Sequence, residues 1–130
     1  MADKSLSLSN AMINLVLRNV AYSPSTTNVF VALFTGAVDT GFTNEVSTVG
    51  TNYSRKQVTF SAASGGQTAN NAEVDFGVAT GNYGNVQNFA LVDNSSGGNI
   101  LYSDSLTVAQ IVSTGNQPKF AIGAITVQES

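Results

Sequence analysis

The sequence predicts an all-β protein, an antiparallel β-sandwich of jelly-roll-like arrangement with one N-terminal helix. After Pro24, about seven or eight short apolar or alternating segments are separated by turn-forming residues, a rhythm typical of sandwiches. No alternation of strands with helices is present, so a parallel sheet is not expected. The 130 residues are expected to form one domain, with 1–24 as an N-terminal arm and helix and 25–130 as the sandwich.

The first elements in chain order are a helix over residues 7–20 and the turn at Pro24 that follows it. Ser7 or Ser9 is the expected N-cap, because a side-chain oxygen there accepts a bond from a free backbone amide. The helix either covers an end of its own sheets or docks on another subunit. Its apolar face, which Ile13, Leu17 and Val20 widen, contains residues spaced by three or four positions: Leu8, Met12, Leu15 and Val16.

The remaining segments have the periodicity of strands. The apolar run over 28–34 predicts a strand buried on both faces, and 72–78 alternates, with Val74, Phe76 and Val78 facing inward. The long stretch 35–52 has no clear period, and its Phe42 either folds back over the core or belongs to a contact loop. The other strands are expected at 53–60, 86–92, 100–105, 107–112 and 119–127.

The composition excludes most enzyme classes and several kinds of partner. His and Cys are absent, so catalytic triads, ordinary zinc sites and thiol chemistry are not expected, and no cofactor is expected. Five Lys and Arg residues and a net charge of -3 argue against nucleic acid and against anionic membrane surfaces. The chain has no apolar run that spans a bilayer and no signal-peptide pattern, so we expect it to be made in a cytosol.

Two acidic patterns resemble parts of catalytic sites. Asp39-Thr40-Gly41 matches the aspartic-protease string, but Phe42 stands where that chemistry needs a small residue, so a turn is expected. Glu73 and Asp75 point to one side of their strand, where a solvated pair is the ordinary outcome. We therefore expect no enzymatic activity. A calcium site that uses Asp93 or Asp104 remains an alternative.

Five strings occur in one order along the chain: 30–35 (FVALFT), 43–47 (TNEVS), 53–60 (YSRKQVTF), 70–76 (NNAEVDF) and 97–102 (GGNILY). Together they resemble a family of small tailed-bacteriophage virion proteins, labelled tail-fibre proteins or capsid decoration (cement) proteins. The resemblance covers residues 8–127. It implies a non-enzymatic structural protein of the virion, assembled in the host bacterial cytoplasm.

The first hypothesis is a homotrimeric capsid decoration protein that stabilises the head by bridging subunits of the major capsid protein. The alternative is a small tail-fibre or baseplate component, or a module that binds a host glycan through a tyrosine, for which Tyr83 between glycines is best placed. Charged residues make up only 10% of the chain, so its surface can lie against a neighbour at low desolvation cost. The residues expected to contact a subunit or partner are Leu8, Met12, Leu15, Phe42, Arg55 and Tyr83.

Overall fold

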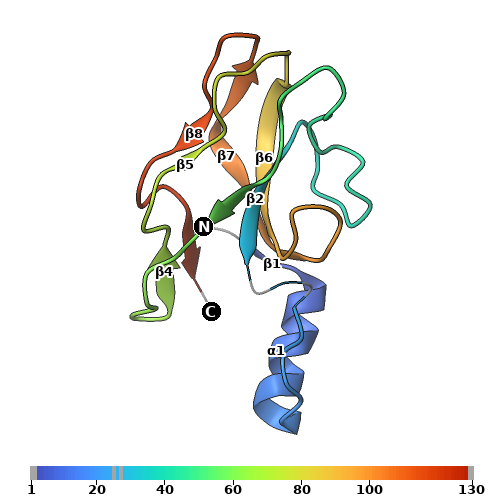
Figure 1. Ribbon diagram of the computed structural model, residues 1–130. Coiled ribbons are helices and arrows are strands. Elements are labelled where there is room, and N and C mark those ends of the chain that lie inside the picture. Colours follow the sequence, from blue (N-terminus) through green and yellow to red (C-terminus); the bar gives the residue numbers. More distant parts are fainter. Residues whose placement is uncertain (1–2, 25, 27, 129–130) are drawn as a thin grey trace.

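The computed structural model describes residues 3–24, 26 and 28–128. Within them the chain is mostly β-structure with a single helix near its N-terminus, which confirms the predicted fold class. The elements are β1 (Asp3–Lys4), α1 (Leu6–Arg18), β2 (Val29–Phe34), β3 (Lys56–Val58), β4 (Gln67–Ala69), β5 (Val74–Asp75), β6 (Gly84–Val92), β7 (Ile100–Val112), β8 (Lys119–Phe120) and β9 (Thr126–Gln128) (Figure 1).

The helix begins earlier than the sequence predicts. Ser5, and not Ser7 or Ser9, is the N-cap: its Oγ accepts the backbone N–H of Leu8 at 3.1 Å. The physical reason is tertiary, since β1 pairs with β7 and Ser5 donates its own N–H to the carbonyl of Leu101 at 2.7 Å, so the chain leaves the sheet there. The helix ends at Arg18, and its C-cap is Asn19, which has a left-handed φ of 55°.

One antiparallel sheet of five strands forms the larger layer, in the order β1-β7-β6-β2-β3. β2 lies between β6 and β3, and its residues Val31–Phe34 are buried on both faces, as the apolar run predicts. The expected strands over 100–105 and 107–112 are one strand, β7, because no turn interrupts the chain between them.

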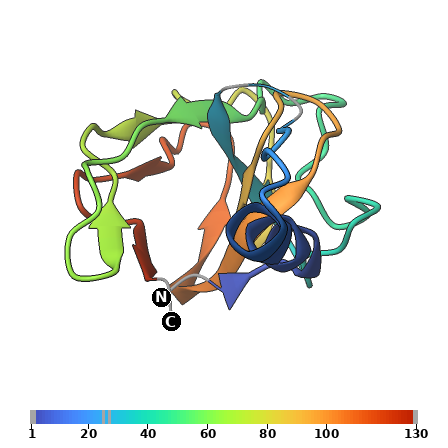
Figure 2. The same ribbon diagram turned by 90° about the horizontal axis from the view of Figure 1, so that it is seen from below.

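Two small sheets, β5 with β8 and β4 with β9, form the second layer (Figure 2). The core between the layers contains Val31, Leu33, Phe76, Phe89 and Ile125. Two layers of antiparallel strands agree with a β-sandwich, whereas the jelly-roll arrangement stays a prediction.

Two expected strands are shorter than predicted because glycines turn the chain. Gly77 has a φ of 77°, which turns Val78 out to solvent and places Ala79 in the core instead. The expected strand over 119–127 breaks into β8 and β9 around a turn in which Gly123 has a φ of 81°. In the expected strand over 53–60, only β3 pairs with a neighbouring strand, and Phe60 forms an isolated bridge with Asn70.

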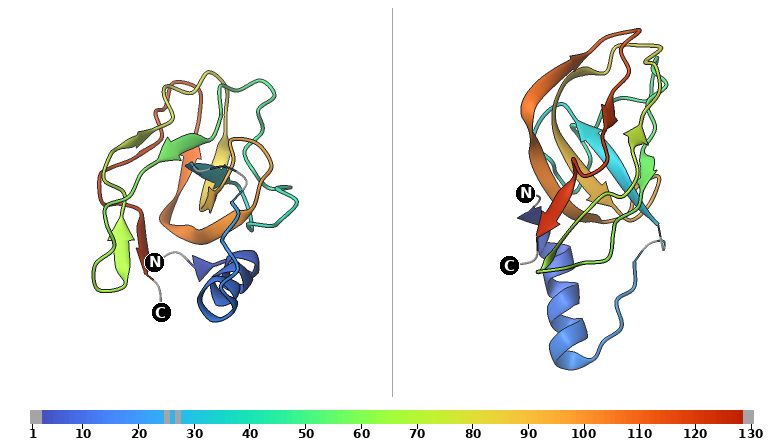
Figure 3. Two further views of the ribbon diagram at one scale, coloured as in Figure 1. Left: turned by 60° about the horizontal axis from the view of Figure 1, so that its bottom comes forward. Right: turned by 90° about the vertical axis from the view of Figure 1, so that its left-hand side faces the viewer.

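α1 projects from one end of the sandwich, and residues 19–24 run back alongside it (Figures 1 and 3). It meets the body at the start of β7, so most of its length lies beyond the sheets. Among the described residues, no helix has the length and apolar character that crossing a membrane requires.

Candidate functional site

The side of α1 that faces away from the body carries four exposed apolar side chains, which we call the outer stripe. Leu6, Ile13, Val16 and Leu17 are 77%, 55%, 71% and 74% exposed. Ile13 lies seven residues after Leu6, and Val16 and Leu17 lie three and four residues after Ile13. These spacings place the four side chains along one side of the helix. Burying such a side chain contributes about 1.5–3 kcal/mol, so exposed apolar side chains on one side of a helix favour an interface.

The neighbouring side of α1 contains three of the predicted contact residues. Leu8 is buried, Met12 is half-buried and Leu15 is exposed. A cleft of about 240 Å³ separates this side from residues 20–23, and Leu8 and Tyr22 line it. Leu8 thus packs on its own domain, while the contact of Met12 and Leu15 with a partner stays a prediction.

Arg55 holds two loops of its own chain together. Its Nε and Nη2 donate to the two carboxylate oxygens of Glu45 at 2.8 and 2.9 Å, and its Nη1 donates to the carbonyls of Asn94 and Gly97 at 3.0 and 2.8 Å. The bonds to Glu45 and its negative charge outweigh burial and raise the pKa of Arg55. Because the guanidinium is nearly fully covered, a partner would meet the loops it holds before it meets Arg55.

Phe42 folds back over the core, one of its two predicted positions. Its ring lies 6.4 Å from that of Phe34 and 4.6 Å from Cζ of Arg55. The left-handed φ of 56° at Phe42 is unfavourable for a bulky residue. The predicted turn at Asp39 stabilises it, since the Asp39 carboxylate accepts both the N–H and the hydroxyl of Thr43, at 3.0 and 2.7 Å.

The Glu45–Arg55 pair is a feature that sequence reasoning missed. The two residues are separated by a loop without period, and no pattern connects a loop carboxylate with a strand guanidinium. The adjacent cations Arg55 and Lys56 were the only signal, and their alternation on a strand indicated opposite faces without showing which one was buried.

Tyr53 and Tyr83 lie beside this pair, in the core. The Tyr53 hydroxyl donates to Glu45 at 2.6 Å and accepts the N–H of Leu33 at 3.1 Å. Tyr83 is 4% exposed and donates to Oδ1 of Asn52 at 2.8 Å, with its ring edge 5.7 Å from Tyr53. The expectation that Tyr83 stacks on a glycan from an exposed turn is therefore wrong, because its ring is packed inside the domain.

These tyrosines should make the protein sensitive to alkali. Burial, followed by the bond to Glu45 and its charge, raises the pKa of Tyr53 far above 10.0, and burial raises that of Tyr83. A group whose pKa is raised in the folded state contributes stability that is complete below about pH 10 and is lost as the pH rises beyond it.

In the wild type, the free energy of unfolding is expected to decrease as the pH rises above about 10. We expect a smaller decrease in Tyr53→Phe, because phenylalanine has no proton to lose. Urea denaturation at several alkaline pH values measures this slope. Tyr22→Phe, at a more exposed tyrosine, is the control and should change the slope less. Equal slopes for wild type and Tyr53→Phe would contradict the assignment.

Asp75 and Asp93, from the acidic patterns of the sequence, accept hydrogen bonds from nearby groups, and a calcium site held by one aspartate stays a prediction. Asp75 accepts bonds from the N–H of Gly77 and from Gln117, at 2.8 and 2.7 Å, and Glu73 is exposed. The Asp93 carboxylate accepts the N–H of Asn99 at 2.7 Å. No group of three or more acidic side chains in the described ranges could hold a metal ion.

A β-sandwich body with a projecting helix that exposes apolar side chains is typical of proteins that assemble with others. The family model described as "Podophage GP4 fiber I protein gp80" matches residues 3–128, and the chain belongs to this family. It is therefore a structural protein of a phage virion, which confirms the resemblance drawn from the five sequence strings. A search of the curated proteins finds no match.

Proposed function

We propose that this chain is a non-enzymatic tail-fibre component of a podophage virion, assembled in the host cytoplasm. The observation that carries the proposal is the match to a fibre family over nearly the whole chain. That description supports the fibre alternative better than the capsid decoration role, which was the first hypothesis. In a decoration role the partner would be the major capsid protein; in a fibre role it is the tail.

The role is mechanical, and α1 is the part that assembles. The outer stripe leaves four large apolar side chains in water, and packing them against a neighbour removes that cost. We propose that the neighbours are two further copies of the chain, which gives a homotrimer. The stripe is wider than the narrow seam of a two-stranded coiled coil, because Val16 and Leu17 both belong to it.

The distribution of charged residues on α1 is consistent with contact between identical helices. Arg18 is the only charged residue of α1, and it lies on the polar side of the helix, with its Nη1 3.4 Å from Oδ1 of Asn14. Copies that meet through the outer stripe therefore bring no like charges together. The sandwich bodies then lie around a central helical contact.

Immunogold labelling of intact virions tests the location. Antibody raised against the purified chain is expected to mark the tail, with the capsid shell unmarked. The control is a virion from which the gene has been deleted, which should carry no label. Label distributed over the head would overturn the fibre proposal in favour of the decoration role.

A further inference from the structure

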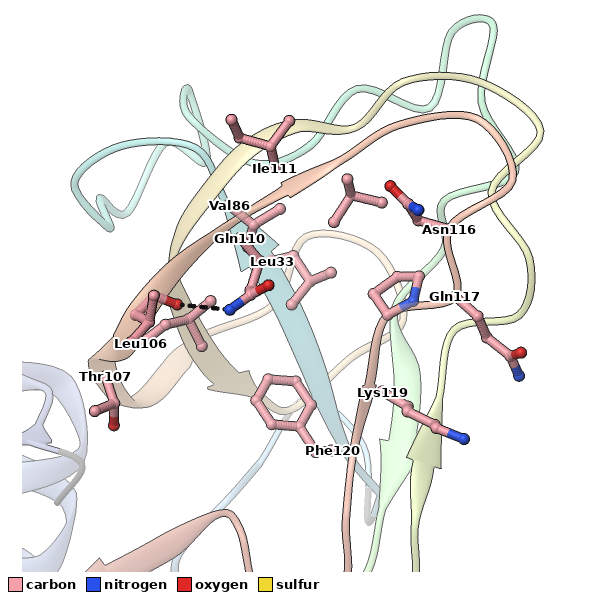
Figure 4. Close-up of a pocket in the computed structure, with 13 residues that line it drawn as sticks. Leu33, Val86, Leu106, Thr107, Gln110, Ile111, Asn116, Gln117, Lys119 and Phe120 are labelled. Carbon is pink, nitrogen blue, oxygen red and sulfur yellow. Dashed lines mark hydrogen bonds between the residues drawn. The ribbon is translucent and has the colours of Figure 1, made fainter.

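A groove of about 640 Å³ opens between β7 and the chain that leads into β8 (Figure 4). Leu33 and Val86 form its floor, and the side chains of Leu106 and Phe120 extend into it from either wall. Lys119 is the only charged residue that lines the groove, and its side chain points away from the cavity. The groove therefore has an apolar floor and walls that include neutral polar residues such as Gln110 and Asn116, and its volume lies in the range of ligand sites, about 300–1,000 Å³.

One wall of the groove is a strand edge without a neighbour. β7 pairs with β6 on one side, with a bulge over residues 106–109, and on the other side β1 reaches only Tyr102 and Ser103. Beyond these, in the part of the chain that the structure describes, no strand pairs with the outer side of β7 over Leu106–Ile111. Val108 and Ile111 are exposed along this edge.

The opposite wall is also an open edge. Val74 pairs with Phe120, Asp75 pairs with Lys119, and the N–H of Phe76 donates to the carbonyl of Pro118 at 3.0 Å. Alternate residues of an antiparallel strand turn their backbone groups to opposite sides, so the N–H and C=O of Lys119 face away from β5. Two strand edges without a neighbouring strand thus border one groove, and on the β7 edge the carbonyl of Val108 accepts the side-chain amide of Gln110 at 3.3 Å.

The geometry points to an extended polypeptide segment of another virion protein as the occupant, bound as an added strand between β7 and β8. An extended chain presents N–H and C=O groups to both edges, while every second side chain points to the apolar floor. A helix satisfies its own backbone groups and leaves both edges unpaired. The segment is expected to alternate apolar and neutral polar residues, because the groove offers its side chains no charge.

The terminal strands of this chain argue against a second copy as the donor. β1 is already paired with β7, and β9 is paired with β4, so neither described terminal strand is free to enter the groove of a neighbour. The inference does not depend on whether the virion carries the chain at its tail or on its head.

The test uses the full chain and a ten-residue probe peptide of alternating valine and threonine with blocked ends. We expect the peptide to slow amide hydrogen exchange at residues 106–111 and at Lys119, and to leave exchange in α1 unchanged. A peptide with alternate amides N-methylated is the control, because it keeps the side chains and loses half of the donors. No change in exchange, or equal protection by the methylated peptide, would overturn the inference.

A matched pair of variants distinguishes binding of the peptide in the groove from non-specific binding to the protein surface. Gln110 and Gln67 are both exposed, and of the two only Gln110 lines the groove, into which its side chain extends (Figure 4). Gln110→Glu is expected to weaken binding of the probe at least tenfold, and Gln67→Glu is expected to leave it unchanged. Equal affinity for both variants would overturn the proposed site, as would cross-linking of Val108 to Val108 of a second copy in virions.

Discussion

Replacing Ile13 and Leu17 by aspartate is expected to convert the assembled protein into single chains while the sandwich stays folded. Both side chains lie on the outer stripe and point away from the body, so the core does not depend on them. An unpaired charge buried in a contact between helices costs about 3–5 kcal/mol, enough to separate chains that associate through a short helix. Light scattering gives the native mass, and thermal unfolding shows whether the body is intact.

The control adds the same charge to the polar side of α1. Ser7→Asp combined with Asn14→Asp introduces two carboxylates, one near the N-terminus of the helix, where the helix dipole favours it, and one beside Arg18, and should keep the wild-type mass. A native mass equal to that of the wild type for the Ile13 and Leu17 variant would contradict the role of the outer stripe.

Arg55→Ala is expected to lower the free energy of unfolding by about 3–5 kcal/mol, because it leaves the Glu45 carboxylate partly buried without its cation. It also removes the bonds to the carbonyls of Asn94 and Gly97 that hold the neighbouring loop. Urea denaturation at neutral pH measures the change.

Lys56→Ala is the matched control, since Lys56 is the next residue along the chain and is less buried than Arg55. We expect it to change the free energy of unfolding by less than about 1 kcal/mol, the usual effect at an exposed ion pair. Similar losses for the two variants would show that Arg55 does not act as a buried clamp.

The elements that the sequence predicted well are those with a local signal. The apolar run over 28–34 is β2, buried on both faces, and the helical spacing before Pro24 is α1. The alternation over 72–78 failed at Val78, because a left-handed glycine at 77 shifts the pattern by one residue, and periodicity does not report φ. The shifted N-cap depends on a bond from Ser5 to β7, which is a tertiary contact.

The functional features were harder to predict, because they depend on which side chains the rest of the fold covers and which it leaves in solvent. Ile13 and Leu17 were recognised as widening the apolar face of the helix, but only the structure shows that their side lies in solvent. Tyr83 between glycines indicated an exposed turn, whereas its ring lies against Tyr53 in the core. The groove beside β7 gives no sequence signal, because it arises where two strand edges fail to meet.

We propose that α1 assembles copies of this chain into a fibre component of the virion. A reconstruction of the tail from purified particles would show this assembly. We expect three sandwich bodies at the tail around a contact formed by their α1 helices, with Ile13 and Leu17 covered. Density for this chain on the capsid shell, or α1 helices that extend separately into solvent, would contradict this proposal.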